Sequence, residues 1–336
     1  MKFYWLNFHL PYACRHSGMC CTAGWPIPVE RARVAAIEET IARNVIPLRV
    51  QPWLLSDAGA PDDVAGILAA RDNGHCVFFE AGQPGCSIHD VKPAACHHFP
   101  YLYLIDQRGV HVSLSHYCPT AASLLFEHRG PVAIVEGHPP TGNDDVEGMD
   151  ARESLPPTFA KASTFAKASV DKTVGKPGNA KPRLMSWDEL SAWEREQVTR
   201  AKIGALDAED VALFEQARAA VPAPWNWPEP PGHLSEIWWS QVAPAWAQFD
   251  EVLANYAAAK LFASWSLYLG DGVRAAAHSA RIASAVLRVE AARQCALSHR
   301  PLDRELMIEA IRQGDLLLVH YADPGLLAAA SSRGGA

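Results

Sequence analysis

Apolar positions recur along this chain with two different periods, and the shorter period predicts strands in its first half. Residues 101–105 and 110–114 are apolar runs with strand character, and a turn-forming Gln-Arg-Gly at residues 107–109 separates them. These segments predict a hairpin. A further buried strand is predicted over residues 76–80, where Val-Phe-Phe follows a cysteine.

Two helices are predicted near the amino terminus. Residues 29–44 place apolar side chains at three- and four-residue steps with charged residues between them, and Pro47 ends that pattern. Residues 64–71 follow Pro61 and two aspartates. Because acidic side chains are favourable at a helix N-terminus, a second helix is predicted there.

From Ser186 onward the pattern is almost entirely helical. Ser186 followed by Glu189 is a capping box, which predicts a helix start. Residues 207–220 predict another short helix, and the proline-rich residues 222–232 predict an extended connector. The longer predicted helices span residues 234–269 with a break at Pro244, 271–298 and 302–318.

The fold class predicted from these patterns is α+β: an amino-terminal domain with short helices and a hairpin, followed by an all-α domain. Between them lie two copies of Phe-Ala-Lys-Ala-Ser, at residues 159–163 and 165–169, which are typical of a low-complexity insertion. The predicted organisation is a domain at 1–136, a linker insertion at 137–183, a helical domain at 184–325 and a disordered tail at 326–336.

Charge is distributed unevenly along the chain. Residues 158–183 carry a net +5, so the formal charge of −7 leaves −12 on the rest. An acidic body without another basic stripe argues against a nucleic-acid partner, and it is compatible with a basic peptide. No stretch reaches the roughly 18 uninterrupted apolar residues of a membrane helix. The first 14 residues do not resemble a signal peptide, so the cytoplasm is the expected location.

Cysteine spacing supplies the strongest chemical signal. Seven of the eight cysteines lie between residues 14 and 118, in short-spaced clusters. Thiolates are soft donors that suit zinc and iron–sulfur clusters, whereas disulfides belong to oxidising compartments and small domains, so a metal centre is favoured over disulfides and over unligated thiols. Cys295 stands alone and is interpreted as a core residue. The seven candidate ligands are Cys14, Cys20, Cys21, Cys76, Cys86, Cys96 and Cys118.

Seven thiolates are too many for one four-ligand centre and one short of two such centres. A histidine could complete a second set, and the candidates are His16, His89, His97 and His98. Cys20 and Cys21 are adjacent, and adjacent side chains of an extended backbone point to opposite faces. Both can reach one site only through a sharp turn, which Gly18 would permit. The choice between iron and zinc stays open.

Four local motifs resemble the CxxCxxCC family of zinc- or iron-chelating proteins, and within it the flagellin lysine-N-methylase branch. They are CRHSGMCC at 14–21, CCTAGWPIPVE at 20–30, GCSIHDVKPAACHHFP at 85–100 and LSHYCPTAA at 114–122. A weaker similarity, Asn255-Tyr256 followed by Leu261-Phe262, lies in the helical part. Residues 14–126 therefore carry most of the resemblance.

The resemblance implies a metal centre, either an iron–sulfur cluster of the 4Fe–4S type or zinc. It also implies S-adenosylmethionine-dependent methyl transfer to lysine, with a lysine-bearing protein or peptide as partner. Ser17 stands where the family has its second cysteine, and Lys92 and His97 replace arginines, which loses the planar guanidinium fork. No glycine-rich loop of the dinucleotide-binding type locates a donor site, so the catalytic residues remain unassigned.

The alternative function is a non-enzymatic, metal-stabilised or redox-active module that binds a protein or peptide through its tryptophan-rich helices. Aromatic side chains at helical spacing are more often core than pocket. The tryptophans in question are Trp238, Trp239, Trp246 and Trp265. The polar groups near the metal motifs that merit attention are His89, Asp90, Tyr101 and Tyr103.

Overall fold

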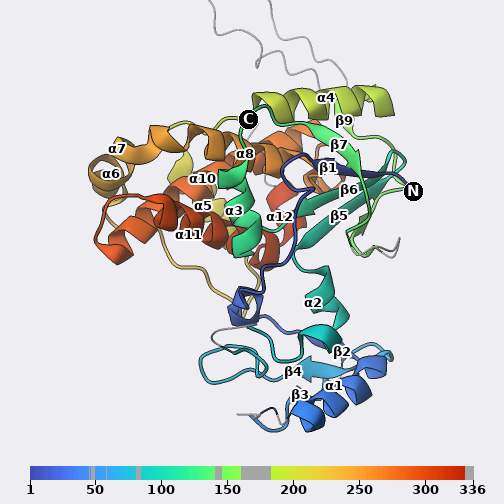
Figure 1. Ribbon diagram of the computed structural model, residues 1–336. Helices are drawn as coiled ribbons and strands as arrows, with labels where there is room; N and C mark the ends of the chain where they lie inside the picture. Colours follow the sequence, from blue (N-terminus) through green and yellow to red (C-terminus); the bar gives the residue numbers. More distant parts are fainter. Residues whose placement is uncertain are drawn as a thin grey trace, which may run out of the picture.

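The computed structural model describes residues 1–44, 46, 50–57, 59–80, 85–140, 146–159 and 183–329. These residues form a larger body of sheet and helices and a smaller lobe, which lies below the body in Figure 1. Strands occur mostly in the amino-terminal part and helices dominate the carboxyl-terminal half, so the predicted α+β class followed by helices is confirmed. No described helix is both long enough and apolar enough to cross a membrane.

The body contains a five-stranded sheet with strand order β7-β1-β6-β5-β8. Its strands are β1 (Phe3–Leu6), β5 (Tyr101–Asp106), β6 (Gly109–Leu114), β7 (Ile134–Gly137) and β8 (Met149–Asp150). The predicted hairpin is confirmed, because β5 and β6 pair in antiparallel register from Tyr101↔Leu114 to Asp106↔Gly109. Strand β1 was not predicted, and it lies parallel to β6 and antiparallel to β7.

One part of the sheet shares a hydrophobic core with the helices. Successive side chains of a strand point to opposite faces. Phe3 and Trp5 of β1 therefore join a cluster on one face, whereas Leu6 joins the large cluster that also contains Tyr256 and other helical residues. Residues on both sides of the predicted linker at 137–183 therefore share the large cluster, whereas most buried strand residues pack in a separate cluster with α3.

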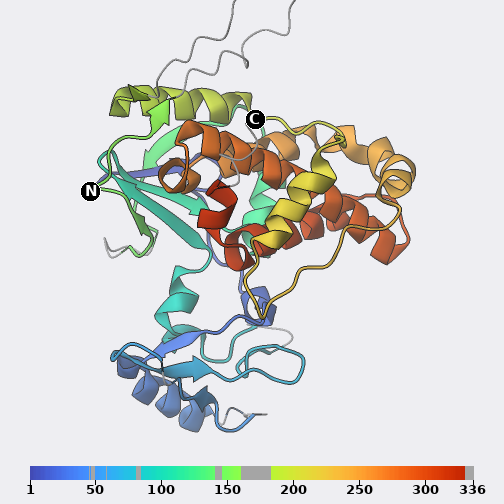
Figure 2. The same cartoon turned by 180° about the vertical axis from the view of Figure 1, so that it is seen from behind.

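Helices make up the remainder of the body, seen from behind in Figure 2. The predicted capping box is confirmed, because the Glu189 N–H donates to Ser186 Oγ at 3.2 Å and the Ser186 N–H donates to Glu189 Oε2 at 2.8 Å. The predicted long helix from residue 234 is divided into several segments, two of them around Pro244. The helical elements are α3 (Pro119–Glu127), α4 (Trp187–Arg200), α5 (Asp210–Ala219), α6 (Leu234–Ile237), π-helix η3 (Trp238–Val242), α7 (Ala243–Trp246), η4 (Ala247–Phe249), α8 (Asp250–Leu261), α9 (Ser266–Leu269), α10 (Val273–Ser298), α11 (Arg304–Asp315), π-helix η5 (Leu316–Tyr321) and α12 (Pro324–Ala329).

The small lobe is built on a three-stranded sheet of order β2-β4-β3. Helix α1 confirms most of the helix predicted at 29–44, and its Ile37 is fully buried beside Phe78 in the core of the lobe. The elements of the lobe are η1 (Met19–Thr22), β2 (Pro28–Glu30), α1 (Arg31–Asn44), β3 (Leu54–Leu55), β4 (Val64–Leu68), η2 (His89–Val91) and α2 (Ala94–His98).

The helix predicted at residues 64–71 is wrong, because residues Val64–Leu68 form β4. This strand is the central one of its sheet, and Gly66 pairs with Val29 of β2. A Cβ on Gly66 would lie 2.2 Å from the carbonyl oxygen of Leu55 on the other side. Close pairing of β4 with both neighbouring strands therefore outweighs the weak preference for a helix that the preceding aspartates confer.

The strand predicted at residues 76–80 is also absent from the structure. Its residues make single bridges, Ala70↔Cys76 and Phe79↔Cys86, joined by a turn in which the Phe79 N–H donates to the Cys76 carbonyl at 3.0 Å. The apolar run is buried, as its composition indicates, but it serves as a turn between two cysteines.

The ends of the predicted insertion lie side by side. Strand β9 (Thr158–Phe159) pairs in antiparallel register with β10 (Arg183–Leu184). Residues 160–182, which hold nearly all of the Phe-Ala-Lys-Ala-Ser repeat, lie outside the described residues. The predicted linker also contains β8, which pairs with β5. The predicted tail at 326–336 begins within α12, where Leu327 and Ala328 are buried, and residues 330–336 lie outside the described residues.

Because β9 and β10 already meet, we expect that residues 160–182 can be replaced by a short glycine-containing turn. The melting temperature and the metal content of the shortened protein should match those of the full chain. Metal analysis and thermal unfolding of both proteins test this. A loss of soluble expression would show that the removed residues pack against the body.

Candidate metal centre

A tight turn carries the adjacent cysteines of the first motif. Gly18 adopts φ +70°, a left-handed conformation that glycine accepts without strain. The next residues form the short 3-10 helix η1, closed by a hydrogen bond from the Cys21 N–H to the Gly18 carbonyl at 2.9 Å. The turn expected at Gly18 is therefore confirmed. It allows Cys20 and Cys21 to share one site, which extended backbone would prevent.

A contact between two glycines brings the loop of the first motif against the loop of the third. A Cβ added to Gly85, which has φ +76°, would lie 2.8 Å from the Gly18 nitrogen. A Cβ on Gly18 would lie 2.7 Å from Phe79 Cε2 and 2.9 Å from the Gly85 carbonyl oxygen. The Cys76 N–H donates to the Cys21 carbonyl at 2.8 Å and joins the remaining loop. Main-chain contacts thus hold all three loops together.

Five of the seven predicted ligands gather where these loops meet. The Cys21 thiol lies near three other thiols, those of Cys20, Cys76 and Cys86, and all three raise its pKa. Cys96 on α2 lies close enough to feel the charges of the same three thiols. Cys21 and Cys76 are buried, and the other three are half-buried at the edge of the small-lobe core. We refer to these five residues as the thiol cluster.

The electrostatics of the thiol cluster favour a bound cation. Hydrogen bonding from Cys21 lowers the pKa of Cys20 to about 7 and also lowers the pKa of Cys76. Hydrogen bonds to its neighbours raise the pKa of Cys21 far above its ordinary value, and burial, then the neighbouring thiolates, raise the pKa of Cys96. Thiolates are the metal-binding form, and here they repel one another. A metal cation at their centre would remove that repulsion.

Positive charge from Lys92 also acts on the thiol cluster. The Lys92 ammonium lowers the pKa of Cys20 and Cys86, although hydrogen bonding is the larger cause at both residues. Lysine at this position therefore retains the charge of the family's arginine. Its Nζ lies 3.5 Å from His89 Nε2, so the same side chain touches the second group of donors.

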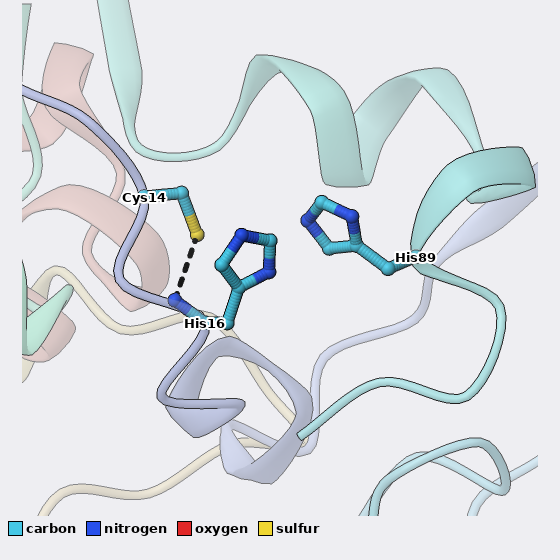
Figure 3. A group of neighbouring side chains, drawn as sticks. All are labelled: Cys14, His16 and His89. Carbon is cyan, nitrogen blue, oxygen red and sulfur yellow. Dashed lines mark hydrogen bonds between the residues drawn. The ribbon is translucent and has the colours of Figure 1, made fainter. Parts of the chain in front are cut away.

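Cys14, His16 and His89 form that second group, shown in Figure 3. One ligand atom from each lies within 4.8 Å of the others, and Cys14 and His16 are exposed. The two imidazole centroids are 4.1 Å apart, and the His16 N–H donates to Cys14 Sγ at 3.4 Å. His16 has φ +54°, which is uncommon for a residue other than glycine. We refer to this group as the Cys-His-His triad.

The triad borders a cavity of about 240 Å³ between η2 and the end of α1. Its lining includes His16, Cys86 and His89, so the cavity lies between the triad and the thiol cluster. Three protein donors beside accessible space are typical of a metal site that keeps an open position, whereas a closed set of four is typical of a structural site. The two groups therefore have different chemical capacities.

Ser17 takes no place in the thiol cluster. Its side chain is exposed, and its hydroxyl accepts a hydrogen bond from the Met19 N–H at 3.4 Å. The position that is cysteine in the family therefore supports the turn in this chain. Because Cys76 brings a further thiol to the cluster, five thiols are still present without one at position 17.

The structure places Cys118 elsewhere. It is buried at the N-terminus of α3, and its Sγ lies 3.4 Å from the Tyr12 hydroxyl. Burial raises its pKa, and the thiol whose charge acts on it is Cys14 rather than any member of the thiol cluster. A ligand role for Cys118 stays a prediction. Cys295 is fully buried in the helical core, as expected.

The remaining candidates are His97, His98, Tyr101 and Tyr103. His98 Nδ1 lies 3.4 Å from Glu147 Oε2. The Nε2 of His97 is buried, and within the described part of the chain it has no hydrogen-bond partner. Tyr103 is buried in the main sheet, and the ring of Tyr101 packs against Tyr12 with centroids 5.4 Å apart.

Comparison with known proteins supports a metal-binding domain in this region. The model of the CxxCxxCC family, described as "Putative zinc- or iron-chelating domain", matches residues 13–119. The match spans the thiol cluster, the triad and Cys118, and it ends before the helical half. No curated protein and no solved structure gave a match. Residues 13–119 are therefore similar to a zinc- or iron-chelating domain.

Proposed function

We propose that the small lobe binds zinc or iron through thiolates of the thiol cluster. The observation that carries this proposal is the convergence of five thiols, from three loops and helix α2, around Cys21. Four thiolates satisfy either a tetrahedral zinc ion or a four-iron cluster. The positive charge of Lys92 beside the cluster compensates part of the negative charge of such a ligand set.

The Cys-His-His triad would bind a second, more accessible metal ion. Imidazole and thiolate together suit zinc and iron. A bound ion with an open position supplies a Lewis acid or an activated water. The protein's part is to hold both imidazoles in the wall of the 240 Å³ cavity, with the Cys14 thiol within 4.8 Å of their ligand atoms.

Metal and sulfide analysis of the full chain, purified without oxygen, tests the metal proposal. We expect either about four iron and four sulfide per chain, with brown colour, or zinc without colour. An additional metal equivalent would correspond to the triad. A chain that contains less than about a tenth of an equivalent of either metal after purification, and that does not take up zinc or iron when reconstituted, would overturn the proposal.

We also propose, on the resemblance to lysine-N-methylases, that the protein transfers a methyl group from S-adenosylmethionine to a lysine of a protein or peptide. The motifs at residues 14–30 and 114–122 support this, and the acidic charge of the body suits a basic substrate. Transfer requires a neutral amine held in line with the donor, because lysine is ordinarily protonated at neutral pH.

Calorimetry with S-adenosylmethionine separates this activity from the alternative. An enzyme should give a saturable heat with the metal-loaded protein, and S-adenosylhomocysteine should compete. A heat equal to the buffer blank would contradict the methyl-transfer proposal. It would leave a non-enzymatic, metal-stabilised module that binds a protein or peptide.

A further inference from the structure

The body contains a cavity of about 170 Å³ that lies outside the small lobe. Its walls come from β5 and β6, the segment between α8 and α9, helix α10, and the stretch from η5 to α12. Most of the lining is apolar. Typical lining side chains are Leu102, Phe262, Trp265, Ile282, Leu318 and Leu327. Trp265, interpreted as core from its spacing, therefore borders a cavity, whereas Trp238 and Trp246 are buried and Trp239 is exposed.

Lys260 is the one charged side chain among the described residues that line this cavity. Its side chain is only 14% exposed, and its Nζ lies 2.5 Å from Asp315 Oδ1. The ring of Tyr256 lies below the ammonium, 5.0 Å from Nζ to the ring centroid. Within the described residues, Asp315 is the hydrogen-bonding acceptor of this ammonium, which has three N–H donors. Lys260 thus has donor capacity left for a ligand.

Asp315, by contrast, has several other donors. The fully buried carboxylate accepts from the Tyr256 hydroxyl at 3.1 Å and from the His116 main-chain N–H at 2.6 Å. His116 Nδ1 lies a further 3.1 Å from it. If the Lys260 ammonium donated a hydrogen bond to a ligand, Asp315 would therefore still accept hydrogen bonds from Tyr256 and His116. This avoids the cost of an unsatisfied buried carboxylate.

Unusual backbone conformations lie in the cavity wall. Leu318 and Val319 line the cavity from the π-helix η5, and π-helices occur frequently at functional sites. Ala263, also in the wall, has φ +53°. Its N–H donates to the buried Glu194 Oε1 at 3.0 Å, which holds this conformation in place. Such sparsely populated conformations cluster at ligand sites.

We propose that this cavity binds a small organic carboxylate with an apolar body. The carboxylate would accept a charge-assisted hydrogen bond from Lys260 Nζ, which it would share with Asp315, and Asp315 would keep its bonds from Tyr256 and His116. Serine hydroxyls line the wall as additional donors, and those of Ser266 and Ser279 lie 2.6 Å apart. An apolar cavity of about 150 Å³ holds benzene, so the present volume suits a body of about six to eight carbons.

Three probes that share a benzene ring and differ in their polar group test this proposal. They are benzoate, benzyl alcohol and benzylamine, and each is titrated into the full chain. Calorimetry should show saturable binding of benzoate, binding of the alcohol that is weaker by on the order of tenfold, and no binding of the amine. Absence of benzoate binding at millimolar concentration would overturn the proposal, as would equal affinity for the alcohol and benzoate.

Two variants, with a third as a control, test whether benzoate binds in this cavity. Ala283→Leu on α10 fills space in the cavity wall and should weaken benzoate binding by about tenfold or more. Ala277→Leu on an exposed face of the same helix should leave the affinity unchanged. Lys260→Gln should weaken benzoate binding by about tenfold while the affinity for benzyl alcohol stays within about threefold. Unchanged benzoate binding in Ala283→Leu would place the ligand elsewhere, and this test holds even if Lys260→Gln fails to fold.

Discussion

Replacing Cys21 by alanine should remove most of the bound metal and destabilise the small lobe. Three other thiols of the cluster lie near Cys21 and shift its pKa, so its loss opens the centre of the thiol cluster. Changes to groups behind a metal's ligands already cost about 10- to 100-fold in affinity, and we expect at least about 100-fold for Cys21 itself. Because metal ligation is coupled to folding, a loss of stability of several kcal/mol should accompany it.

Metal content per chain and thermal unfolding, measured together, check this result. Cys295→Ala is the matched control, because it makes the same substitution at a thiol that is fully buried in the helical core. That variant should be destabilised as any core truncation is, yet it should keep its metal. If Cys21→Ala retains stoichiometric metal, the assignment of the thiol cluster is wrong.

Replacing Gly85 by alanine should weaken metal binding without touching any ligand. The new Cβ would lie 2.8 Å from the Gly18 nitrogen and 2.8 Å from the His16 carbonyl oxygen, and both are main-chain atoms that cannot move alone. The loops that carry Cys21 and Cys86 must therefore separate. We expect a stability loss of about 2–4 kcal/mol, of which roughly 1–2 kcal/mol comes from the left-handed backbone itself.

Gly74→Ala separates these two contributions. Gly74 has φ +78°, close to the +76° of Gly85, but a Cβ at Gly74 would meet no atom within 4 Å. It should therefore show the backbone cost alone, about 1–2 kcal/mol, with full metal content. Comparable metal loss in both variants would mean that the contact between Gly18 and Gly85 does not hold the site together.

Elements with a strong local signal could be predicted from the sequence. The capping box at Ser186, the helix that became α10 and the hairpin of β5 and β6 all depend on neighbouring residues, and the structure contains each of them. Strand β1 carries no such signal, because its partners β6 and β7 lie more than 100 residues further along the chain. Strand β4 was predicted as a helix from its local sequence, and its pairing with strands on both sides outweighed that preference.

The candidate site, too, could be predicted from the sequence only in part. Short cysteine spacings predicted the candidate donors and the class of chemistry, and Gly18 indicated the turn beside Cys20 and Cys21. The spacings could not show which donors share a centre. In the structure, the contact between Gly18 and Gly85 joins the loops of Cys21 and Cys86, while Cys14 lies beside two imidazoles and Cys118 lies beside Tyr12.

The cavity of the body had only weak signals in the sequence, Trp265 and the similarity at residues 255–262. Lys260, Asp315 and His116 come from α8, α11 and the loop after β6, and no motif joins them. Residue types, helix periods and ligand spacings are local properties, and they are enough to predict the helices, the hairpin and a metal-binding region. The core shared by distant segments, the grouping of the candidate ligands and the burial of Lys260 depend on contacts between residues far apart in the chain, so they become visible once the chain is folded.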